Sequence, residues 1–207
     1  MPAPQPPRLV LASASPARLR TLRSAGIEPE VVVSGVDEST VTESSAGKLS
    51  LRLAEWKAAA VATRVTAGPL VLGCDSVLEF DGEVYGKPVD TEDAVSRWKR
   101  MRGRTGVLHT GHCLIDTGSG RTAADMADTL VRFAEITDDE IAAYVATGEP
   151  LRVAGGFTID GLGGAFIDGV DGDPGTVIGL SLPLLRGLLR QFGYTITDLW
   201  SAPTTGA

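Results

Sequence analysis

Strand and helix signals alternate along the first part of this sequence. Residues 8–12 predict a strand, and residues 16–25 predict a helix that Ser15 caps and Gly26 ends, with proline at its first position. A second strand is expected at residues 31–34. This order, in which each strand leads into a helix, is typical of an α/β fold with helices packed on a sheet.

A long helix and a buried strand are expected next. Residues 45–64 predict the helix, because apolar side chains repeat at the spacing of one helical face; they are Leu49, Leu53, Trp56 and Ala60. The apolar run at residues 69–79 predicts the buried strand. Asp81-Gly82 follows that run between apolar pairs, which indicates a β-hairpin.

The second half of the sequence adds an antiparallel pair of strands and more helices. The expected strands are residues 107–116 and 129–134, and the expected helices are residues 91–101, residues 137–146 behind a Thr137–Glu140 capping box, and much of residues 177–192, bent or broken at Pro183. We therefore expect a mixed, twisted sheet flanked by helices.

Length and composition favour one domain. The chain has 207 residues, 43% of them hydrophobic, which is enough for one core. We expect that domain at residues 8–200, between flexible segments at residues 1–7 and 201–207. Cys74 and Cys113 both lie in apolar, strand-like surroundings, and two cysteines make no disulfide framework, so both are expected to be reduced core thiols.

Charge and hydropathy limit the partners. The net charge of −7 disfavours nucleic acids and anionic membranes, which would repel the chain, so a polyphosphate site would need local Lys and Arg. No uncharged run approaches the roughly 18 residues that a membrane span needs, and residues 1–7 lack a basic leader pattern. We therefore expect a cytoplasmic protein.

The first helix begins with a pattern suited to anions. Ser13, Ser15 and Arg18 place two hydroxyl groups and a guanidinium at a helix N-terminus that directly follows a strand. The helix dipole and the free N–H groups of the first turn favour a bound anion there. The alternative is that Ser15 only caps the helix.

Carboxylates and lysines supply the other candidates. Asp75 lies within an apolar run, where an ionised carboxylate is costly unless it binds a metal or water; otherwise it caps a turn or faces solvent. Glu38 ends the second strand and is either a partner of Asp75 or a surface residue. Lys57 and Lys87 are candidate point charges for phosphates, although lysines at such positions are more often solvated.

These residues, taken in order, resemble the signature of the Maf family of nucleoside triphosphate pyrophosphatases. The resemblance rests on Ser13-x-Ser15-Pro16-x-Arg18, Asp37-Glu38, Lys57, Asp75 and Gly86-Lys87-Pro88, and it continues through Thr110-Gly111 and Ala154-Gly155-Gly156-Phe157 to Gly179-Leu180-Ser181-Leu182. It implies a two-lobed α/β fold with a central cleft, similar to the inosine triphosphatase-like fold, a divalent metal (Mg²⁺ or Mn²⁺) and often a homodimer.

The resemblance also implies a role for each matching residue. Asp75 would be the catalytic proton acceptor, and Glu38 would join it at the metal. The groups around the phosphates would be Ser13, Ser15, Arg18, Lys57 and Lys87. Positions tied to the choice of base are Ala17, where the family usually has a basic or bulky residue, Ser76, which keeps the hydroxyl of a frequent Thr, and Asp160, where one branch has Gln.

The expected activity is hydrolysis of a nucleoside triphosphate, standard or modified, to a nucleoside monophosphate and pyrophosphate. The sequence offers no serine, cysteine or histidine array for a covalent intermediate, so direct attack by water is expected. Two alternatives remain open: a nucleotide-binding regulator of cell division without significant turnover, and a phosphatase that removes only the γ phosphate.

Overall fold

The computed structural model describes residues 7–66 and 68–201. Its strands are β1 (Leu9–Leu11), β2 (Glu30–Val31), β3 (Leu70–Phe80), β4 (Glu83–Tyr85), β5 (Thr105–Asp116), β6 (Thr122–Phe133) and β7 (Ile167–Asp171), and its α-helices are α1 (Pro16–Ser24), α2 (Ala46–Ala62), α3 (Thr91–Met101), α4 (Asp138–Ala146), α5 (Pro174–Ile178) and α6 (Leu182–Gln191). The predicted flexible ends lie outside the described residues, apart from Pro7 and Ser201. No helix in the described part is long and apolar enough to cross a membrane.

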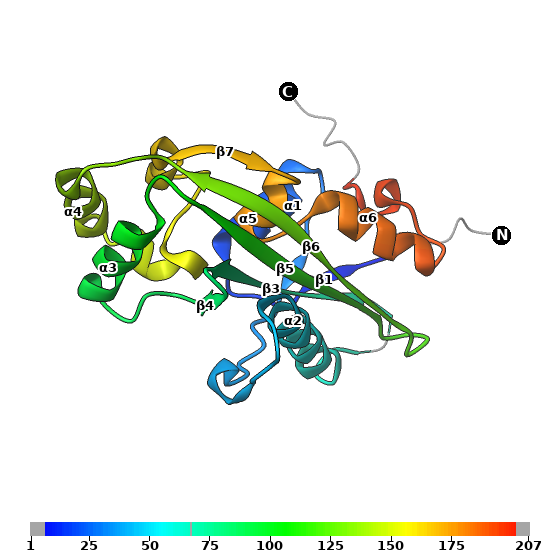
Figure 1. The fold of residues 1–207 in the computed structure, drawn as a ribbon. Helices are drawn as coiled ribbons and strands as arrows, with labels where there is room; N and C mark the ends of the chain where they lie inside the picture. Colours follow the sequence, from blue (N-terminus) through cyan, green and yellow to red (C-terminus); the bar gives the residue numbers. More distant parts are fainter. Residues whose placement is uncertain (1–6, 67, 202–207) are drawn as a thin grey trace, which may run out of the picture.

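The strands that the structure describes form one mixed sheet, as the sequence predicts. Its order is β2-β1-β3-β5-β6-β7, with β4 paired to β3. β1 runs parallel to β2 and β3, whereas the pairs that involve β4, β5, β6 and β7 are antiparallel. The long strands β3, β5 and β6 form the twisted centre of the molecule (Figure 1).

Helices cover both faces of this sheet. α2 packs across β3 and β5 on one face, and α5 and α6 contact β5 and β6 on the other. α3 and α4 pack on each other at the far end of the long strands (Figure 1). Three buried apolar clusters result: cluster 1 between the sheet, α1 and α6, cluster 2 around α3 and α4, and cluster 3 beneath α2.

The predicted start and end of α1 are confirmed. The Ser15 side chain accepts a hydrogen bond from the Arg18 backbone N–H, and Pro16 is the first helical residue. Gly26 follows the helix with a φ of 77°, a conformation that costs glycine little. The Asp81-Gly82 hairpin is also confirmed, since both residues have positive φ, as a type I′ turn requires.

The predicted apolar face of α2 coincides with the buried face only at Leu53. Its buried residues are Ala46, Gly47, Ser50, Leu53, Ala54, Lys57, Ala58 and Val61, whereas Leu49, Trp56 and Ala60 are only half-buried. The reason lies in the sheet beneath. A Cβ added to Gly73 would meet Ala54 and Ala58, and one added to Gly111 would meet Ser50 and Leu51. These two glycines let α2 approach so closely that its small residues, rather than its largest, face the strands.

Three other boundaries differ from the prediction. β2 is only two residues long, and β6 begins at Thr122 rather than 129 because it pairs with nearly the whole length of β5 despite its polar sequence. The last helical region divides into α5 and α6 at Gly179, which has a φ of 115°. Pro183 does not break a helix; it lies in the first turn of α6, where a missing N–H costs nothing.

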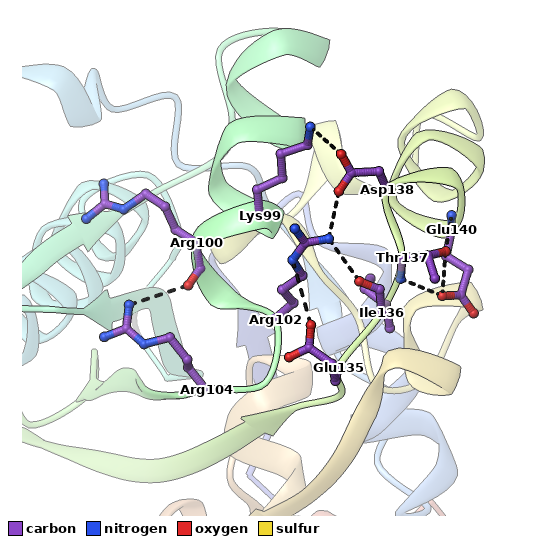
Figure 2. A network of polar contacts seen from close by, with 9 residues as sticks. All are labelled: Lys99, Arg100, Arg102, Arg104, Glu135, Ile136, Thr137, Asp138 and Glu140. Atoms are coloured by element: carbon purple, nitrogen blue, oxygen red, sulfur yellow. Dashed lines mark hydrogen bonds and ion pairs between the residues drawn. The ribbon is translucent and has the colours of Figure 1, made fainter.

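A polar network joins α3 to α4 at the end of the sheet. Asp138, in the first turn of α4, accepts hydrogen bonds from Lys99 (2.8 Å) and Arg102 (2.7 Å), and Arg102 also donates to the carbonyl of Ile136 (Figure 2). The predicted capping box of Thr137 and Glu140 is confirmed beside it. The contacts fix α4 against α3 over cluster 2.

Candidate active site

One edge of β3 changes partners halfway along the strand. β1 pairs with β3 as far as Leu72, and the last ladder bond runs from the Ala12 N–H to the Leu72 carbonyl. β4 pairs with the same edge only from Leu78 onward. In the described structure residues 73–77 therefore have a ladder partner on one side only, β5. Asp75 and Ser76 lie in this interval, next to the point where the chain leaves β1 for α1.

Three of the predicted residues meet on the α2 side of this interval. The Lys57 ammonium lies 2.5 Å from Asp75 Oδ1 and 2.7 Å from Glu38 Oε1. Lys57 and Asp75 are both buried, whereas the Glu38 side chain is 53% exposed. The lysine therefore bridges a buried and an exposed carboxylate. Because Lys57 belongs to the buried face of α2, close helix packing on Gly73 brings it to β3.

Burial and nearby charges shift the pKa of Asp75 in opposite directions. Burial raises the pKa of its carboxyl above the ordinary value, and the charges of Lys57 and Arg18 oppose this by lowering the pKa. The net effect of burial and charge is a raised pKa for Asp75. A carboxylate with a raised pKa is a stronger proton acceptor while it stays ionised at neutral pH.

A second group of predicted residues meets on the opposite side of β3. The buried Arg18 guanidinium donates to the Gly179 carbonyl (2.8 Å), Ser13 Oγ (3.1 Å) and Ser76 Oγ (3.1 Å). These three bonds tie α1 to β3 and to the end of α5. Successive strand residues point to opposite faces, so Asp75 and Ser76 present the two groups on either side of the same edge.

The remaining predicted residues are more dispersed. Ser15 caps α1 and donates its backbone N–H to Ser13 Oγ. Ala17 is half-buried on α1, and Lys87 is exposed in the loop after β4. Asp160 is exposed and pairs with Arg20 of α1 at 3.1 Å.

Sequence reasoning assigned no role to several residues that support the site. Thr110 is fully buried on β5; its hydroxyl lies 2.9 Å from Ser76 Oγ and donates to the Thr176 carbonyl at 2.7 Å. Glu149 accepts four hydrogen bonds in the loop after α4. The hydroxyl of Thr110 within a mostly buried strand was a detectable signal. Apart from Tyr144 on α4, the partners of Glu149 lie outside α-helices and strands, where no periodic pattern predicts contacts.

Both histidines lie near this part of the sheet and face opposite sides, as their spacing predicts. His112 is fully buried: its Nδ1 lies 3.0 Å from the Thr110 carbonyl, and its Nε2 accepts the Ser181 N–H at 2.9 Å. His109 bonds through Nδ1 to Asp128 at 2.7 Å on the other face. Cys74 and Cys113 are buried free thiols, as predicted.

Asp75 and Glu38 are the carboxylates that could hold part of a divalent-metal site. Among the described residues no three His, Cys, Asp or Glu side chains come together as a complete metal site. Asp75 and Glu38 nevertheless lie within 2.7 Å of one cation, the Lys57 ammonium. Mg²⁺ is usually held by one or two carboxylates together with substrate phosphates and water, so this donor set suits Mg²⁺ or Mn²⁺ brought in with a triphosphate.

Comparison with known proteins gives one family for this chain. A model of the family described as "Maf-like protein" matches residues 8–192. A Salinispora tropica protein is 63% identical over 97% of this chain and 90% of its own length, and a Streptomyces coelicolor protein is 62% identical over 96% and 97%. A Thermosynechococcus vestitus protein is 53% identical over 92% and 96%. All three are named nucleoside triphosphate pyrophosphatase. This chain belongs to the Maf family.

Proposed function

We propose that this protein hydrolyses nucleoside triphosphates between the α and β phosphates, releasing a nucleoside monophosphate and pyrophosphate. The observation that carries the proposal is the buried Asp75, with its raised pKa, at an interrupted edge of the sheet that has Lys57 on one side and Arg18 on the other. The names of the relatives point to the same reaction.

Asp75 would take the proton from the attacking water. Its carboxylate lies on a central strand that β5 holds along its whole length, so its position is rigid. Lys57 would favour the ionised carboxylate and orient it through the 2.5 Å contact. General base catalysis of this kind contributes about 10²- to 10⁴-fold to a rate.

Cationic side chains would bind the polyphosphate. Arg18 uses three of its five N–H donors within the protein, which fixes the guanidinium and leaves donors for a phosphate oxygen. The N-terminus of α1, with Ser13 and Ser15, adds hydroxyl groups and the positive end of the helix dipole. Lys57 and Lys87 would supply further positive charge to offset the charge that builds on the leaving pyrophosphate.

A divalent cation is part of the proposal. Glu38 and Asp75 would hold Mg²⁺ or Mn²⁺ together with the substrate, and the ion would neutralise phosphate charge and acidify the water. Selection of the base is assigned to the surface near Ala17, Ser76 and Asp160. The family resemblance also predicts a homodimer, which light scattering on the purified protein would test.

Product analysis tests the reaction. The purified protein is incubated with a panel of standard and modified triphosphates and Mg²⁺ or Mn²⁺, and the products are separated. We expect monophosphate and pyrophosphate in equal amounts. Diphosphate with orthophosphate would instead identify a γ-phosphatase, and nucleotide binding without products would identify a regulator of cell division.

A further inference from the structure

The carboxylate of Glu149 organises the segment that carries Asp160. Its Oε1 accepts hydrogen bonds from the Tyr144 hydroxyl (2.9 Å), the Thr158 hydroxyl (2.6 Å) and the Gly163 N–H (3.0 Å), and its Oε2 accepts the Leu162 N–H (3.1 Å). Two of these donors are backbone groups on the far side of Asp160. One side chain therefore closes residues 158–163 into a loop.

Packing restricts the same loop. A Cβ added to Gly163 would overlap the Tyr144 hydroxyl, so only glycine fits beneath it. Phe157 is part of cluster 2, and Ile159 packs against that cluster. The loop is thus anchored on the side of α3 and α4, with Asp160 exposed at its turn.

From this loop Asp160 reaches a different part of the molecule. Its carboxylate accepts a hydrogen bond from Arg20 of α1 at 3.1 Å. α1 packs through Leu22 into cluster 1, and it carries Arg18 two residues before Arg20. The Arg20 side chain is 63% exposed, so this ion pair adds little to stability. Its consequence is geometric, because it connects the 158–163 loop to α1, the helix that also carries Arg18.

We propose that Glu149 is a positioning residue for nucleoside recognition: its carboxylate holds the 158–163 loop so that Asp160 meets Arg20 on α1, the helix whose N-terminus is proposed to bind phosphate. The inference rests on the proposed function. A nucleoside triphosphate extends beyond its phosphates, so its sugar and base must lie against surfaces that adjoin the phosphate site. α1 and the loop form one such surface, and Glu149 determines the shape of the half that the loop contributes.

The first test is the kinetics of Glu149→Gln. In this variant an amide NH₂ group replaces Oε2 and faces the Leu162 N–H. Because both groups are donors, the loop loses the hydrogen bond from Leu162 and the two groups repel each other. We expect KM to rise by about tenfold or more while kcat changes by less than about threefold, because the loop affects binding rather than the chemical step. Thr158→Val removes one hydrogen-bond donor to Glu149 and should raise KM less than Glu149→Gln does. It replaces Glu149→Gln as the test if that variant does not fold.

A matched control and a double variant separate positioning from general stability. Glu140 also accepts backbone and hydroxyl hydrogen bonds, in the capping box of α4, and Glu140→Gln should leave KM unchanged. If Glu149 acts through the Asp160–Arg20 pair, Glu149→Gln should raise KM less in an Arg20→Gln background than in the parent. Equal increases in both backgrounds, or an unchanged KM in Glu149→Gln, would overturn the proposal.

A measurement without turnover keeps this inference distinct from the proposed reaction. In Glu149→Gln the amides of Leu162 and Gly163 should exchange with solvent faster than in the parent, and the affinity for a non-hydrolysable triphosphate should fall by about tenfold. If the parent releases no pyrophosphate but the variant loses this affinity, the reaction is wrong and the positioning role stands. Unchanged affinity contradicts the positioning role whatever the parent catalyses.

Discussion

At the scale of single residues, the chemistry centres on Asp75. Its burial raises the pKa of the carboxyl, and the charges of Lys57 and Arg18 act in the opposite direction. Both effects depend on the position of Asp75 in the part of β3 that only β5 pairs. An aspartate at a strand end in water would have neither the raised basicity nor the fixed orientation.

Replacing Asp75 tests this assignment. Asp75→Asn should lower kcat by roughly 10²- to 10⁴-fold, because the amide keeps the shape of the carboxylate but cannot accept the proton. Circular dichroism should show that the variant stays folded. Asp139→Asn, an exposed position in the first turn of α4, is the control and should keep full turnover. Near-normal turnover of Asp75→Asn would remove Asp75 from the role of base.

At the scale of secondary-structure elements, the approach of α2 to the sheet decides whether the site forms. Gly73 on β3 and Gly111 on β5 leave room for the helix backbone, and this contact places Lys57 beside Asp75. α1 is fixed in a different way, by the three hydrogen bonds of Arg18. The site thus depends on one helix that packs closely and one that is tied by polar contacts.

Gly73→Ala tests the close packing of α2. The added methyl group would lie within 2.9 Å of Ala58 Cβ and overlap the Ala54 carbonyl, so the helix must shift. Overpacking of a core costs about 1–3 kcal/mol, and we expect a loss of stability in that range, measured by urea unfolding, together with weakened turnover. Gly187→Ala on α6 is the control: its Cβ meets nothing, and it should raise stability by about 0.5–1 kcal/mol.

At the scale of the whole molecule, stability should depend on pH through a buried histidine. His112 connects β5 to the N-terminus of α6, and burial lowers its pKa from the ordinary 6.5 to about 4. The unfolded chain therefore binds this proton at a higher pH than the folded protein does. The His112 contribution to stability is complete above pH 6.5 and falls as the pH decreases toward 4.

The size of this effect can be measured. Lowering the pKa of His112 from 6.5 to about 4 corresponds to a loss of roughly 3 kcal/mol in the free energy of unfolding between neutral pH and pH 4, before other groups are counted. Urea unfolding at several pH values should show the loss in the parent and a shallower dependence in His112→Gln, which keeps an oxygen for the Ser181 N–H. Equal slopes in the two proteins would show that His112 does not control acid stability.

Local sequence patterns predicted most of the helices and strands and most of the candidate residues. Caps, turn residues and apolar periodicity are local, so the helix after Ser15, the hairpin at Asp81-Gly82 and the capping box at Thr137 could be predicted. The carboxylate within an apolar strand marked Asp75, because an isolated buried charge is costly whatever surrounds it.

How these residues meet follows from long-range packing. The buried face of α2 depends on glycines of two strands that follow the helix in the chain, so helical periodicity alone pointed to Leu49 and Trp56 instead. Two sets of contacts join residues from separate elements: the bridge from Lys57 to Asp75 and Glu38, and the ion pair of Arg20 with Asp160. Such contacts arise from the packing of the sheet and its helices, which no local pattern encodes.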